Sequence, residues 1–93
     1  MRYKIEYMPK VLKELDKIEK GDKKTREKID IFLKDLEDAQ NPRRFGNVKK
    51  LVNVENTYRW RVGKYRIVGS FEDDILVILI VKIDKREDVY KDL

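Results

Sequence analysis

The stretch that decides the fold of this chain is YRWRVGKYRIV, residues 58–68. It predicts two short strands joined at the Gly-Lys pair, because glycine permits the backbone angles of a two-residue hairpin turn. Successive side chains of a strand point to opposite faces of a sheet. The turn therefore sets Trp60 opposite Ile67 on one face and Arg61 opposite Arg66 on the other.

The predicted hairpin gathers three arginines on one face, because Arg59 lies two residues further along the same face as Arg61 and Arg66. Like charges directly opposite each other destabilise a sheet. The arrangement therefore predicts an anion that meets the guanidinium groups. Trp60, on the apolar face, is expected in the core rather than as a stacking platform for nucleic-acid bases.

The composition excludes several classes of site. The chain has 93 residues, enough for one domain over 1–93, and contains neither histidine nor cysteine. Disulfides, thiolate metal sites and histidine-dependent triads are therefore excluded. The N-terminus has no apolar segment typical of a signal peptide, and the longest apolar run, Ile75–Val81, is too short to span a bilayer. We expect a cytoplasmic protein without a membrane partner.

The positive charge is concentrated in the middle of the chain. Net charge is +5, yet residues 41–66 alone carry 8 basic side chains and 1 acidic one. A local basic excess predicts a polyanionic partner, which could be nucleic acid, an acidic protein or an anionic membrane surface. The alternative is an ordinary solvated surface, although that fits side chains held on a hairpin less well. The basic residues preceding the hairpin are Arg43, Arg44, Lys49 and Lys50.

The remaining pattern predicts an α+β fold. Residues 1–7 alternate as a half-buried strand, and apolar stripes at helical spacing follow over about 9–21 and 23–38. Residues 41–57 are expected to form a loop with weak strand character around 48–54. The run 75–81 predicts a central strand buried on both faces. The order β-α-α-β-β-β predicts an antiparallel αα-hairpin packed on a mainly antiparallel four-stranded sheet, with the arginine side partly open.

A second motif, KREDVY at residues 85–90, follows the predicted central strand. Together with the arginine hairpin, the length and the element order, it resembles the RelE/ParE superfamily of toxin–antitoxin toxins. RelE-like members cleave messenger RNA, usually in the ribosomal A site, whereas ParE-like members poison DNA gyrase. The resemblance favours the RelE-like branch. It implies a cognate antitoxin in a hetero-oligomer, mRNA and the ribosome as partners, and neither metal nor cofactor.

The resemblance also implies roles for residues of this chain. The basic residues of the middle strands correspond to Arg59, Arg61 and Arg66, and those near the C-terminus to Arg86 and Tyr90. Lys85 occupies a position where relatives have histidine or lysine. The candidate catalytic residues are Arg61, Arg66, Lys85, Arg86 and Tyr90. The candidate RNA-binding residues are Arg59, Arg43, Arg44, Lys49 and Lys50.

The residues fit a metal-free cleavage, because RNA supplies its own nucleophile, the 2′-hydroxyl. Arginines suit stabilisation of charge on the scissile phosphate. Tyr90 and Lys85 are the candidate proton carriers, since nearby guanidinium groups favour phenolate and neutral amine. Relatives have lysines where this chain has Arg59 and Arg61, and arginine does not readily carry protons.

Other roles remain open for these residues. Tyr90 could cap the core edge or stack on a base, and Arg86 could pair with a neighbouring acid. We expect Lys85, Arg86 and Tyr90 to reach the face of the arginine hairpin. The alternative functions are a ParE-like gyrase inhibitor without nuclease activity and a non-catalytic nucleic-acid-binding module.

Overall fold

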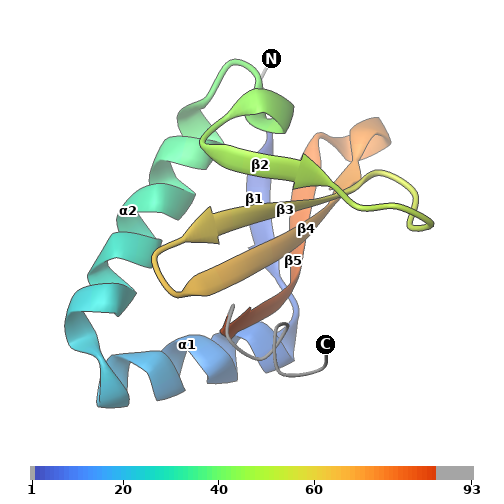
Figure 1. The fold of residues 1–93 in the computed structure, drawn as a ribbon. Helices are drawn as coiled ribbons and strands as arrows, with labels where there is room; N and C mark the ends of the chain where they lie inside the picture. The colour runs from blue at the N-terminus through green and yellow to red at the C-terminus, as the bar shows by residue number, and fades with distance from the viewer. Residues whose placement is uncertain (1, 86–93) are drawn as a thin grey trace.

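The computed structural model of the protein describes residues 2–85. One sheet has the strand order β1-β5-β4-β3-β2, and two helices pack on one of its faces (Figure 1). The helices are α1 (Pro9–Gly21) and α2 (Lys23–Asp38), and two 3-10 turns are η1 (Pro42–Arg44) and η2 (Asp73–Ile75). The strands are β1 (Lys4–Tyr7), β2 (Asn47–Lys50), β3 (Thr57–Val62), β4 (Tyr65–Glu72) and β5 (Val77–Lys85).

The sheet is mixed but mainly antiparallel. β1 pairs with β5 in parallel, and the other three pairings are antiparallel. The predicted α+β class is confirmed, whereas the predicted count of four strands is wrong because β2 adds a fifth strand at the edge. Three of the four β2 residues are exposed. This strand overlaps the start of the segment 48–54, for which the sequence predicts weak strand character, and it forms by pairing with β3.

The hairpin has the predicted register. Trp60 lies opposite Ile67 and Arg61 opposite Arg66. Gly63 begins the turn with φ +57°, a left-handed conformation that residues with a Cβ adopt at a cost. The hairpin thus presents an apolar face and a cationic face, as its alternation predicts.

Both helices bury one stripe against the apolar face of the sheet, as their spacing predicts, although Leu12, which the spacing also assigns to the stripe of α1, is 50% exposed. They are joined through Asp22, whose side chain accepts the Thr25 N–H at 3.2 Å and so caps the first turn of α2. From this junction the helices splay apart more than a side-by-side antiparallel pair would (Figure 1). The buried stripes consist of Val11, Leu15, Ile18, Ile29, Leu33 and Leu36.

β5, the predicted central strand, lies between β1 and β4 and differs from its prediction in extent and in burial. It begins only at Val77, because Ile75 belongs to η2 and is 68% exposed. It continues to Lys85, beyond the end of the apolar run. Ile78 and Ile80 are fully buried on the helix side, whereas Leu79 is only half-buried on the other face. Val77 is also buried on that face, so burial on both faces holds only at the start of the strand and is incomplete beyond it, because helices cover only one face.

Within residues 2–85, none of the helices is long and apolar enough to cross a membrane.

Candidate functional site

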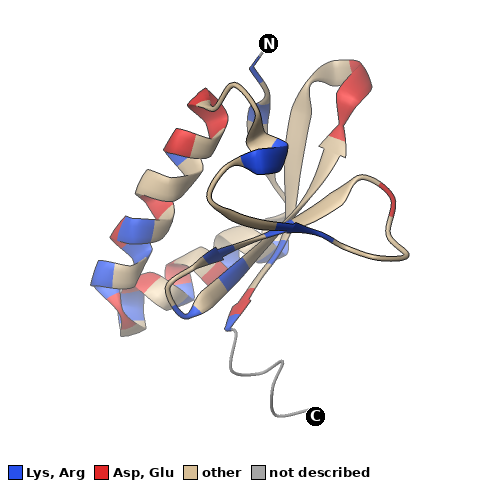
Figure 2. Ribbon diagram, turned by 45° about the horizontal axis from the view of Figure 1, so that its top comes forward, with Lys and Arg blue, Asp and Glu red and all other residues tan. Residues whose placement is uncertain are grey.

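Charged side chains gather on the sheet face opposite the helices. The strand register forms two rows across the sheet on this face. One row runs Asn47, Arg61, Arg66, Asp84, and the other runs Lys49, Arg59, Val68, Lys82. Basic segments of neighbouring strands lie together in Figure 2. We call the charged members, Lys49, Arg59, Arg61, Arg66, Lys82 and Asp84, the arginine face.

The arginines of this face are held close to the sheet. Arg59 is only 8% exposed, and Arg61 and Arg66 are partly buried. Directly paired residues have Cβ atoms about 4.5–5.5 Å apart, so Arg61 and Arg66 bring two positive charges together. Within the described residues, the buried Arg61 Nε has no hydrogen-bond acceptor. A buried N–H group without an acceptor lowers the stability of a protein. An oxyanion bound at this face would accept that hydrogen bond and remove the cost.

Asp84 is the acidic residue of the face, and the sequence reasoning missed it. Its two carboxylate oxygens accept hydrogen bonds from Arg66 Nε and from one terminal guanidinium nitrogen of Arg66, each at 3.0 Å. Lys82 Nζ approaches the same carboxylate at 3.3 Å. Burial raises the pKa of Asp84, but the hydrogen bonds from Arg66 and Lys82 outweigh burial and the net pKa is lowered. Alternation continued from the buried Ile78 and Ile80 would have placed Lys82 and Asp84 on the helix side, so the pattern alone could not have found them. The register shift that leaves Val81 without a partner in β4 turns them to the arginine face.

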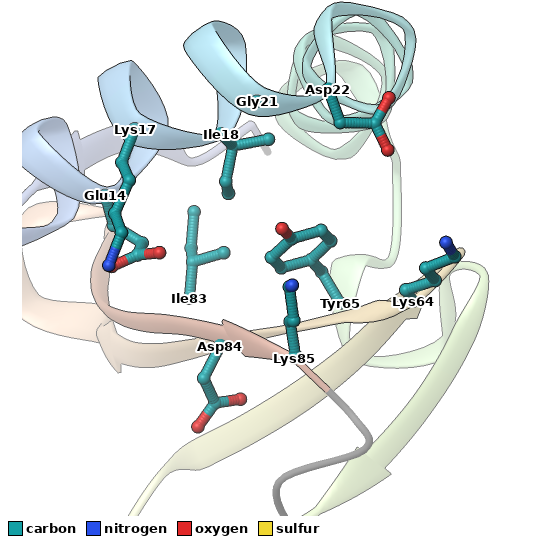
Figure 3. Close-up of a pocket in the computed structure, with 10 residues that line it drawn as sticks. All are labelled: Glu14, Lys17, Ile18, Gly21, Asp22, Lys64, Tyr65, Ile83, Asp84 and Lys85. Carbon is teal, nitrogen blue, oxygen red and sulfur yellow. The ribbon is translucent and has the colours of Figure 1, made fainter.

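Lys85 does not belong to the arginine face, and the prediction that β5 carries it there is wrong. Its cross-strand partner is Tyr65, a core residue on the helix side. Figure 3 shows Lys85 pointing toward Tyr65 and α1, while Asp84 points to the other side of the strand. Lys85 lines a cleft with Ile18 and Ile83 at the end of α1. The cause is the register shift between β4 and β5, which leaves Val81 without a partner and inverts the alternation, so that Ile83 and Lys85 face the helices.

Arg43, predicted to bind RNA, lies instead in a structural contact on the helix side of the sheet. Its guanidinium donates to both carboxylate oxygens of Asp73 at 3.0 Å and lies 4.0 Å from the centroid of the Phe71 ring. Tyr3 donates its hydroxyl to the same carboxylate at 2.6 Å. Hydrogen bonds from Tyr3 and Arg43 lower the pKa of Asp73. Arg43 thus ties η1 to η2, and its functional groups already have partners.

The other predicted basic residues divide between the two sides of the sheet. Lys49 pairs with Arg59 and joins the arginine face, whereas Lys50 pairs with Tyr58 and faces the other way. Arg44 is exposed in η1. Arg86 and Tyr90 lie outside the described residues. Among residues 2–85, no three acidic side chains gather where they could hold a metal ion.

The comparisons with known proteins agree with the resemblance. Residues 5–90 match the family model described as the ParE toxin of the type II toxin–antitoxin system parDE. The Methanocaldococcus jannaschii protein named as a toxin, RelE1, is 30% identical over 91 residues, with 98% of each chain covered.

Solved structures extend this agreement to the fold. The archaeal RelE–RelB complex from Pyrococcus horikoshii OT3 contains a chain with a TM-score of 0.74 and 30% identity, covering 92% of this chain and 97% of that one. A mutant of the E. coli toxin RelE in the free state has a TM-score of 0.72 and 26% identity, covering 98% and 93%. Sequence and fold therefore place this chain in the RelE/ParE superfamily of toxins from type II toxin–antitoxin systems.

Proposed function

We propose that the protein is a RelE-type endoribonuclease that cleaves messenger RNA in the ribosomal A site and so inhibits translation. The observation that carries the proposal is the Arg61–Arg66 pair on a mainly cationic face, with a buried Arg61 Nε that lacks an acceptor among the described residues. Planar guanidinium groups match phosphate oxygens in geometry and charge. Relatives named RelE support the choice of this branch.

The proposed reaction needs no nucleophile from the protein. The 2′-oxygen of the ribose loses its proton and bonds to the adjacent phosphorus, and the bond from phosphorus to the 5′-oxygen breaks. The products are a 2′,3′-cyclic phosphate and a 5′-hydroxyl, which takes up a proton. Arg61 and Arg66 stabilise the additional negative charge on the phosphate in the transition state, which is commonly the largest contribution to such catalysis.

The proton transfers are assigned to the C-terminal motif. Arginine stays protonated, so Arg59 and Arg61 bind phosphate but do not act as bases. Tyr90 is the proposed base, since the guanidinium groups of a phosphate site favour a phenolate. Arg86 follows the last residue of β5 directly in the sequence and is the proposed third phosphate ligand. Lys85 faces the helices in the described structure, so we assign it no step.

The proposed protein partner is a cognate antitoxin. The Pyrococcus horikoshii relative was crystallised as a RelE–RelB complex, which supports a toxin–antitoxin hetero-oligomer here. Five cations against one acid on the arginine face favour an acidic antitoxin segment over this surface. The proposed site of action is the cytoplasm, where ribosomes and mRNA are present.

A ParE-like inhibitor of DNA gyrase is the second candidate. The description of the matching family model as a ParE toxin favours it. In that case the arginine face would bind without catalysis. A nuclease would produce new mRNA ends, whereas a gyrase inhibitor would leave mRNA intact and cause broken DNA to accumulate.

The deciding experiment adds the protein to an actively translating extract and maps mRNA ends by primer extension. We expect codon-spaced cuts that disappear with Arg61→Ala, Arg86→Ala and Tyr90→Phe but persist with Lys13→Ala, a control that removes one exposed positive charge from α1. Intact mRNA together with trapped gyrase–DNA complexes would overturn the nuclease and support the second candidate.

A further inference from the structure

The arginine face already contains an anion, which is the side chain of Asp84. Its carboxylate meets Arg66 through two parallel hydrogen bonds of 3.0 Å. The pair spans two neighbouring strands in direct register, so the backbone holds the two side chains together. Both are largely shielded, with side-chain exposures of 24% for Arg66 and 20% for Asp84.

This contact uses the same chemistry as phosphate binding. A phosphate binds arginine through two of its oxygens, in the fork geometry that the carboxylate uses here. Arg66 Nε and one terminal nitrogen are both engaged by Asp84, so this edge of the guanidinium is occupied. Lys82 neutralises the same carboxylate rather than facing an external anion. Arg61, by contrast, has no acidic neighbour in its cross-strand row except beyond Arg66.

We propose that Asp84 is an intramolecular competitor of phosphate, which occupies the binding edge of Arg66 until an incoming phosphate group displaces it. The inference rests on the proposed function for the identity of the phosphate as that of RNA, but the competition itself requires only an oxyanion. An isolated phosphate gains little by displacing the Asp84 carboxylate from Arg66, because one anion then only replaces another. A polyanion gains more, because its further contacts with the other cations of the face offset the lost ion pair. The face therefore selects extended phosphate chains over free phosphate.

The experiment measures phosphate binding at Arg66 directly. The protein labelled with nitrogen-15 is titrated with inorganic phosphate at constant ionic strength, and the Arg66 Nε–H resonance is followed by NMR. We expect Asp84→Asn to tighten phosphate binding at this resonance by about 3- to 10-fold, because it removes one charge at contact distance while preserving the shape of the side chain. The effect decreases as salt is added, since salt screens partly exposed charges.

Two further variants separate competition from other effects. Asp74→Asn removes the same charge from an exposed position in η2 and is expected to leave the titration unchanged. In Arg66→Ala, binding is followed at the Arg61 Nε–H resonance, and adding Asp84→Asn is expected to give less than a twofold gain. A thermal melt of each variant verifies that it is folded.

Unchanged or weaker phosphate binding in folded Asp84→Asn would overturn the proposal, because Asp84 would then only position Arg66. An equal gain in Asp74→Asn would also overturn it, since the effect would be one of net charge. The readout is independent of RNA cleavage. Failure of the proposed nuclease appears in the translation extract, whereas failure of the competition appears only in the phosphate titration.

Discussion

Gly69→Ala tests how tightly the core supports the hairpin. Gly69 lies in β4 at a bulge, opposite Ile80 of β5. A Cβ at this position would lie 2.9 Å from Trp60 Cζ3, 3.0 Å from Ile78 Cγ2 and 3.3 Å from Ile80 Cδ1. Contacts below 3.0 Å do not occur for real Cβ atoms, so the surrounding side chains must move. The backbone angle of Gly69 is not in the left-handed region, so the effect is steric.

The neighbours of Gly69 have little room to move. Trp60, Ile78 and Ile80 are each 0% exposed. Trp60 also donates its indole N–H to the Pro42 carbonyl at 3.2 Å, which restrains the ring. An added methyl group in a filled core costs about 1–3 kcal/mol. Replacing glycine also reduces the conformational entropy of the unfolded chain, which stabilises the folded state by about 0.4–1 kcal/mol and offsets part of this cost. We therefore expect a net destabilisation of about 1–2 kcal/mol.

The free energy of unfolding is measured by urea denaturation followed by circular dichroism. We expect a lower urea midpoint for Gly69→Ala with an unchanged slope. The matched control is Gly21→Ala, at an exposed site at the end of α1 with nothing within 4 Å, which we expect to stabilise the protein by about 0.5–1 kcal/mol. In a Trp60→Phe background, which lacks the contacting atom, the cost of Gly69→Ala should fall. A Gly69→Ala midpoint at or above that of the wild type would refute the packing argument.

Three further changes test contacts elsewhere in the fold. Arg43→Ala should lower the thermal midpoint more than Arg44→Ala, because only Arg43 packs on an aromatic ring and pairs with an acid; equal midpoints would contradict the structural role of Arg43. Glu37→Ala should cost about 1–3 kcal/mol in urea denaturation, because the Glu37 carboxylate accepts the Ile5 N–H at 2.8 Å on the outer edge of β1. The lowered pKa of Asp84 contributes stability that is present above the unfolded value near 3.9 and is lost as pH falls through the folded value. Thermal melts between pH 5 and about pH 2 should therefore show a steeper loss for the wild type than for Asp84→Asn, and parallel curves would exclude this linkage.

The sequence alone determined the hairpin and the two helix stripes, because these depend on local geometry. A two-residue turn sets the pairing of its own strands, so Arg61 opposite Arg66 follows from the order of residues 58–68. Helical spacing likewise identified the buried side of α1 and α2. The absence of histidine and cysteine from the sequence excluded disulfides, thiolate metal sites and histidine-dependent triads without any structural information.

Only the tertiary structure decided which charges meet across segments that are distant in sequence. The pairing of β4 with β5 depends on η2 and on the bulge between Val68 and Gly69, neither of which is visible in an apolar pattern. Shifting a strand by one residue moves every side chain to the opposite face. That register sets Asp84 against Arg66 and turns Lys85 toward the helices. Arg43 is likewise assigned by contacts with β4 and η2, not by its basic neighbours in the sequence.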